Sequence, residues 1–76
     1  MRAIYEVAHD IQEEWGSKVY FGAKPYLGAM THLLNKNSKF GVDTATNIVY
    51  RFLANAQTFK GPRARELKAE LKSLIK

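Results

Sequence analysis

The sequence predicts an all-α fold, a compact single domain of residues 1–76 with four helices at about 2–16, 24–36, 43–59 and 62–75. Three observations lead to this class. Apolar residues recur at intervals of three and four in four stretches of the chain. Glycine, proline or polar residues separate these stretches. Only one short β-prone run, Val19–Tyr20–Phe21, is present, and a strand without a partner does not make a sheet.

The first helix is predicted from its two faces. Its apolar face carries Ile4, Val7, Ile11 and Trp15, at offsets 0, 3, 7 and 11, while acidic residues occupy another side. Gly16 suits the end of this helix, because helices often end at a residue in the left-handed conformation and glycine adopts that conformation readily. The following segment, residues 17–24, is expected to be an extended connection whose aromatic residues, Tyr20 and Phe21, tuck under the helices.

The second helix is expected to begin near Pro25, since the missing N–H of proline costs nothing in a first turn. Its helically spaced apolar residues are Tyr26, Leu27, Met30, Leu33 and Leu34. His32 lies among them, which favours a hydrogen-bonded structural histidine over a ligand. The polar segment 35–41 is predicted to be a loop.

The third and fourth helices have clear boundary signals. Asp43 is a suitable N-cap for a helix over 43–59, which is expected to be the longest. Gly61 and Pro62 then end one helix and start the next. The last helix places Ala64, Leu67, Leu71, Leu74 and Ile75 inward. The predicted common core contains Trp15, Tyr26, Leu27, Met30, Phe52, Leu53, Leu67 and Leu71.

Composition excludes several classes of protein. The chain has no cysteine, so it has neither disulfides nor a Cys-ligated zinc. Its longest apolar run is far shorter than the roughly 20 residues that span a bilayer, and the acidic start is unlike a signal peptide. We therefore expect a cytoplasmic protein without a membrane partner.

Catalytic motifs are not evident either. His9 and Glu13 stand four residues apart on one helix face, but two ligands are fewer than a zinc site uses. The sequence contains no Gly-x-Ser-x-Gly elbow and no glycine-rich phosphate loop. We expect a protein that is not an enzyme, with no catalytic residue, metal or cofactor; a small hydrolase or metal enzyme using His9 and Glu13 is the weakest hypothesis.

Charge is distributed unevenly along the chain. The net charge is +5, from 12 basic and 7 acidic residues, yet residues 1–16 hold four acidic residues and one basic residue. On the last helix, Arg65, Lys68, Lys72 and Lys76 form a stripe at offsets 0, 3, 7 and 11. The candidate face for a nucleic acid or an acidic partner consists of Lys60, Arg63, Arg65, Lys68 and Lys72.

Two alternatives to this interpretation stay open. Lysines near a helix C-terminus also complement the helix dipole and solubilise a small domain. The opposite charges of the first and last helices could instead steer a protein partner or a second copy of the chain, as in a homodimer.

The aromatics Tyr20, Phe21 and Tyr26 alternate with Lys18 and Lys24 and could stack on unpaired bases, although core packing is the commoner role.

Three segments resemble short proteins encoded by bacteriophages and mobile elements: Val19–Met30 after Trp15, Phe52–Ala56, and Gly61–Leu71. The likeness extends from the first helix to the last. It implies an origin, and by association the cytoplasm of a bacterial host, but no activity and no site residues. We expect a non-enzymatic interaction protein of phage or mobile-element origin that binds a host or phage protein. The alternative is a nucleic-acid-binding accessory or regulatory protein that uses the basic face.

Overall fold

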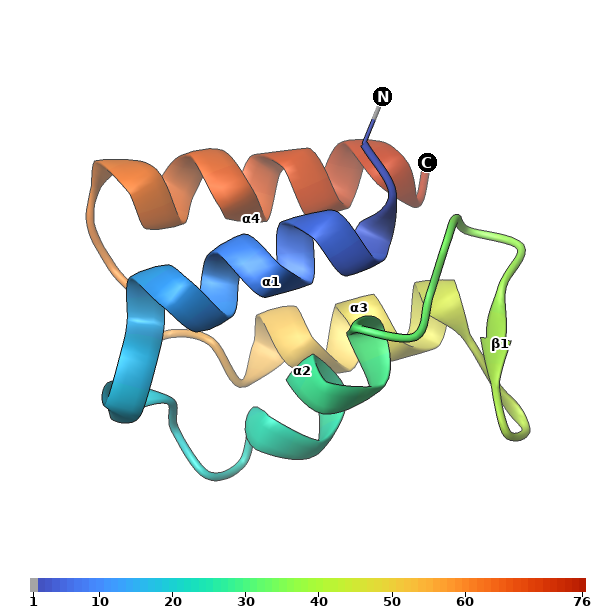
Figure 1. Cartoon of the computed structure of the whole chain (residues 1–76), viewed down its shortest axis with the longest axis horizontal. Helices are drawn as coiled ribbons and strands as arrows, with labels where there is room; N and C mark the ends of the chain where they lie inside the picture. The colour runs from blue at the N-terminus through green and yellow to red at the C-terminus, as the bar shows by residue number, and fades with distance from the viewer. Residues whose placement is uncertain (1) are drawn as a thin grey trace.

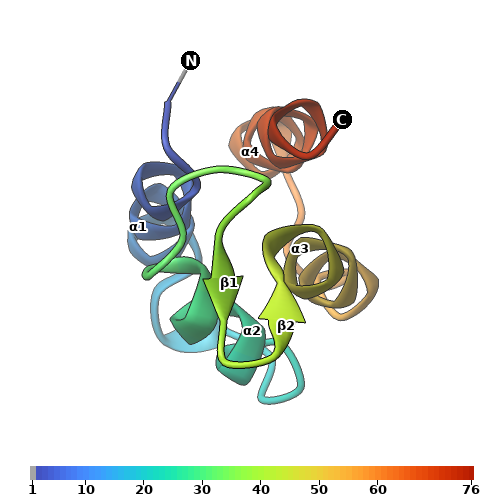
Figure 2. The ribbon, with the colours of Figure 1, turned by 90° about the vertical axis from the view of Figure 1, so that its right-hand side faces the viewer.

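Four α-helices surround one core in the computed structural model, which describes residues 2–76. α1 (Ile4–Trp15) and α4 (Pro62–Leu74) lie side by side, with α2 (Lys24–Met30) and α3 (Ala45–Ala54) completing the arrangement (Figure 1). The main contacts between helices are those of α1 with α4 and α2, and those of α3 with α2 and α4. An end-on view shows the four helices around a common centre (Figure 2). The predicted helical single domain is thus confirmed.

The core is apolar and continuous across all four helices. Trp15 stacks on Phe59 with 4.8 Å between ring centroids and meets Phe52 edge-on at 6.2 Å. Six of the eight predicted core residues are buried, and the other two, Tyr26 and Leu53, are half-buried and packed against the cluster. Periodicity therefore identified the inward faces of α1, α3 and α4, whereas Leu34, predicted with the second helix, is 58% exposed.

α2 is much shorter than predicted, because it ends at Met30 and not near residue 36. The chain after α2 forms hydrogen bonds with the first residues of α1. The carbonyls of Leu33 and Leu34 accept hydrogen bonds from the N–H groups of Tyr5 and Ile4, each at 2.9 Å. The first N–H groups of any helix lack partners within that helix. Residues 33–34 supply those partners to α1.

The predicted loop over 35–41 contains a strand that the sequence did not indicate. β1 (Lys39–Phe40) pairs antiparallel with β2 (Asp43–Thr44), in the register Lys39 opposite Thr44 (Figure 2). Gly41 takes φ 64° in the turn between them, a conformation that glycine adopts without strain. The result is a small hairpin at one end of the helical domain.

The boundaries predicted for the third helix are wrong at both ends. Asp43 is not its N-cap: it belongs to β2, and the Thr44 hydroxyl accepts the Asn47 N–H at 3.2 Å. The helix ends at Ala54, where the side chain of Asn55 donates to the Arg51 carbonyl at 2.9 Å. α3 therefore has 10 residues and is shorter than α4, which has 13 and begins and ends close to its predicted limits.

The connection between α1 and α2 also departs from expectation. It begins with a short 3-10 helix, η1 (Gly16–Lys18), and continues as turns. Tyr20 and Phe21 do not tuck under the helices: they are 43% and 76% exposed. The Tyr20 ring lies over Gly22, where a Cβ would come within 2.6 Å of it, so this position suits glycine. Within residues 2–76, no helix has the length and apolar character needed to cross a membrane.

Candidate nucleic-acid interface

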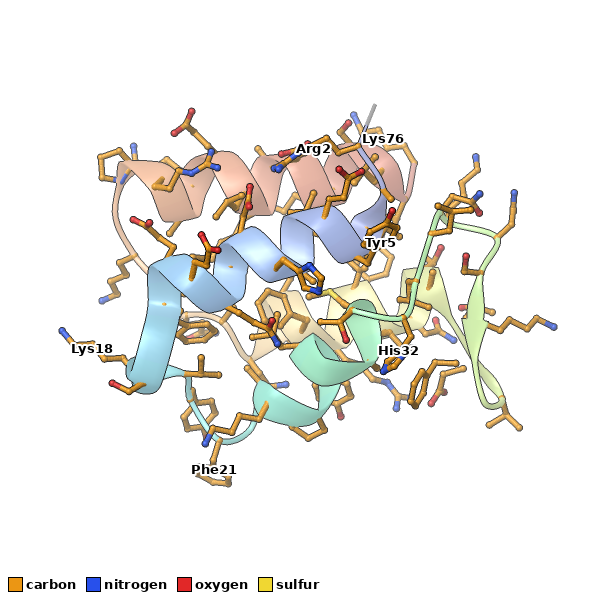
Figure 3. All side chains as sticks on the ribbon, viewed as in Figure 1. Arg2, Tyr5, Lys18, Phe21, His32 and Lys76 are labelled. Carbon is orange, nitrogen blue, oxygen red and sulfur yellow. The ribbon has the colours of Figure 1, made fainter. Side chains whose placement is uncertain are left out.

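The two flanks of α4 differ in charge balance, and the flank next to α1 is neutralised. Arg2 donates to both oxygens of Glu70, at 2.9 and 2.7 Å, and also to Asp10 on α1 (Figure 3). Arg63 donates to the same Asp10 oxygen at 3.1 Å. The hydrogen bonds from Arg2 lower the pKa of Asp10 and of Glu70, and the positive charges of Arg2 and Arg63 add to the effect. These ion pairs therefore join acidic α1 to basic α4. We call this line of contact the seam.

The other flank of α4 carries positive charges that are close together. Burial is the largest influence on Lys68 and lowers its pKa, and the nearby charges of Lys72 and Lys60 lower it further. Among residues 2–76, the ion pairs involve only Arg2 and Arg63 as cations. Within the same range, Lys60, Lys68 and Lys72 thus form a group without a carboxylate in salt-bridge distance. Arg65 is exposed on the same helix flank.

Lys68 is held in place by its surroundings. Its Nζ donates to the Phe59 carbonyl at 2.6 Å and lies 5.7 Å from the centroid of the Phe59 ring. The side chain is half-buried, so its stem packs while its ammonium stays near the surface. An ammonium has three N–H donors, which leaves further donors available for a ligand.

The five residues of the predicted basic face are therefore not equivalent. Lys60, Arg65 and Lys72 are exposed, and Lys68 adjoins them on the same flank. Arg63 lies instead on the seam with Asp10. Lys76, at the end of the predicted stripe, accepts a hydrogen bond from the Lys36 ammonium through its main-chain oxygen at 2.8 Å. Lys60, Arg65, Lys68 and Lys72 therefore remain as one group on this side of α4. We call this group the lysine flank.

A hollow adjoins the lysine flank between the end of α1 and the segment that precedes α4. Its volume is about 440 Å³, and it is lined by Glu14, Trp15, Lys18, Thr58, Phe59 and Lys60. It brings Lys18 to the same recess as Lys60, although they are far apart in sequence. Sequence reasoning associated Lys18 only with its aromatic neighbours, because helical spacing relates residues within one helix and not across a connection.

Both histidines are exposed, and within residues 2–76 neither belongs to a group of three possible metal ligands. His9 is exposed and packs edge-on against Tyr5, with 6.2 Å between ring centroids. In the part of the chain from residue 2 onward, no three His, Asp or Glu side chains are grouped for metal binding. The expected structural role of His32 is wrong: it is exposed and lies 5.4 Å from the ring of Phe40.

The hairpin end presents a second, apolar surface. Val42 at the turn is 97% exposed, Leu34 is 58% exposed and Phe40 is 46% exposed. We call Phe40, Val42 and His32 the hairpin surface, because Phe40 packs against His32 and Val42 follows it in the turn, whereas Leu34 lines a separate hollow. Contiguous exposed apolar patches mark contacts with other macromolecules more often than single exposed residues do.

No protein-family model matches the chain, and no curated protein or solved structure is significantly similar to it. Its function must therefore be inferred from the residues themselves.

Proposed function

We propose that this protein binds nucleic acid through the lysine flank, with the phosphate backbone as the principal contact. The observation that carries this proposal is geometric: Lys68 is held by the Phe59 carbonyl at 2.6 Å with exposed Lys60, Arg65 and Lys72 on the same flank, and among residues 2–76 none of the four pairs with a carboxylate. Like charges held together disfavour the charged state, and a polyanion relieves that repulsion. Contacts of this kind give strong salt dependence and little sequence preference.

The distribution of acidic groups supports the same proposal. Asp10 and Glu70 are engaged by Arg2 and Arg63 on the opposite flank of α4. A phosphate that approaches the lysine flank consequently meets cations anchored on a helix whose apolar face is fixed in the core. Because Arg63 forms an ion pair with Asp10, we assign Arg63 no direct contact with the nucleic acid.

The test is DNA binding, measured by fluorescence anisotropy between 50 and 200 mM salt, roughly the range over which phosphate contacts weaken strongly. We expect log K to fall linearly with log salt. The double change Lys60→Gln and Lys72→Gln should weaken binding and make the slope shallower by about 1 for each phosphate that is no longer neutralised.

The matched control removes a charge from the hairpin. Lys39→Gln changes an exposed lysine of β1 and should leave the slope almost unchanged, whereas Lys60→Gln alone should already make it shallower. Millimolar binding at low salt, or an equal loss of affinity in these two single variants, would overturn the proposal.

A second candidate function is supported by the hairpin surface. We propose it as a contact for a host or phage protein, in keeping with the resemblance to phage and mobile-element proteins. Val42→Ser should abolish a stoichiometric complex isolated from a bacterial host, while the Lys60→Gln and Lys72→Gln variant retains it. Sedimentation of the pure protein checks whether the partner is a second copy. A complex that survives Val42→Ser and Phe40→Ser rules this surface out.

A further inference from the structure

Two exposed aromatic side chains stand on the connection between α1 and α2. The rings of Tyr20 and Phe21 are 4.9 Å apart at 53°, and Phe21 is 76% exposed. The Tyr20 ring lies over Gly22, in the space that a Cβ there would occupy, and near Asn55, which follows α3. The pair is therefore an aromatic surface outside the core.

This aromatic pair is connected to the lysine flank. Tyr20 lines a hollow of about 240 Å³ together with Asn55 and Thr58. Thr58 also lines the hollow that holds Lys18 and Lys60. Figure 3 shows Lys18 and Phe21 projecting from the same connection at one end of the molecule. Thr58 thus links the hollow beside Tyr20 to the one that holds Lys60, and Phe21 adjoins the first through its contact with Tyr20.

The charges beside the aromatic pair are mostly positive. Lys18 and Lys24 flank it in sequence, and both are exposed. One acidic residue, Glu14, shares the hollow with Lys18 and Lys60. The positive charge of these lysines does not complement an apolar protein partner. It complements a ligand that carries phosphate groups.

We infer that the preferred ligand is single-stranded nucleic acid, with unpaired bases stacked on Phe21 and Tyr20 and the backbone passing Lys18 and Lys60 toward Lys68. This inference rests on the proposed nucleic-acid function. Single-strand binders combine a basic path with aromatic platforms, because every base has a face on which an aromatic ring can stack. In a duplex those faces are covered by neighbouring base pairs, so Phe21 adds nothing to duplex binding.

The experiment compares an oligothymidylate with a duplex of equal phosphate number, at one low salt concentration. We expect tighter binding of the single strand, and Phe21→Ala should weaken it about tenfold. The same change should leave duplex binding unaltered, and Phe21→Trp should retain single-strand affinity. Tyr50→Ala is the matched control, since Tyr50 is 61% exposed on α3 outside this surface. Thermal unfolding establishes that each variant is folded.

The outcomes separate this inference from the proposed function. Equal affinity for both DNA forms, with no effect of Phe21→Ala, overturns the single-strand inference while the lysine flank keeps its role. Failure to bind either form removes both. If Phe21→Ala abolishes a stoichiometric protein complex and leaves single-strand affinity intact, the aromatic pair belongs to a protein interface and the inference is wrong.

Discussion

Arg2 and Glu70 form a two-point ion pair across 68 positions of the chain, with Arg2 Nε and Nη2 lying 2.9 and 2.7 Å from the two carboxylate oxygens. The same guanidinium donates to Asp10, so one side chain holds carboxylates from α1 and α4. This contact joins the segment before α1 to the second half of α4. Its side chains are about one-third exposed, at 35% and 32%, and water therefore screens the interaction.

Glu70→Gln should lower the free energy of unfolding by about 1 kcal/mol or less, because it removes a charged two-point contact that is only partly shielded from water. Urea denaturation measures the change. Glu66→Gln is the matched control on the same helix, since Glu66 is exposed and outside this ion-pair network. An equal loss of stability in both variants would show that the position on the helix matters and the Arg2 contact does not.

Stability should also fall in acid. Hydrogen bonds from Arg2 lower the pKa of Glu70 from its ordinary 4.5 and that of Asp10 from 3.8. A carboxylate whose pKa is lower in the folded state stabilises the fold fully above its unfolded pKa and loses that contribution as pH falls through the folded value. The loss should begin near the ordinary values and continue below them. Unfolding followed at several pH values should give a shallower acid dependence for Asp10→Asn with Glu70→Gln than for the wild type.

Thr44→Ala should cost about 1 kcal/mol of stability, because it leaves the Asn47 N–H at the start of α3 without its hydroxyl acceptor. Thr44→Ser keeps the oxygen and should restore most of the loss. Asp43→Ala tests the cap that the sequence suggests and should have the smaller effect. The assignment fails if thermal unfolding shows the larger loss at Asp43.

Two glycines should respond in opposite directions to alanine. Gly28 is exposed within α2, and a Cβ there meets nothing within 4 Å, so Gly28→Ala should stabilise the protein by about 0.5–1 kcal/mol. Gly61 has φ 112°, which alanine adopts only with strain, so Gly61→Ala should destabilise by about 1 kcal/mol or more. Calorimetry of the two variants provides the comparison, and the same sign for both would contradict this explanation.

Helical periodicity correctly predicted the elements whose boundaries depend on local signals. α1 and α4 occupy nearly their predicted ranges, and their inward apolar residues are mostly buried. The end of α2 was not predictable in this way, because residues 33–34 are drawn out of the helix by the N–H groups of Ile4 and Tyr5, far away in the chain.

The sequence by itself determined that Arg65, Lys68 and Lys72 share one flank of a helix, because helical geometry relates residues three, four and seven positions apart. Only the tertiary structure decided that Asp10 forms an ion pair with Arg63, and that Lys18 shares a recess with Lys60. The physical reason is that periodicity describes one helix at a time. Ion pairs and hollows arise where separate segments meet, and their positions depend on how the core brings those segments together.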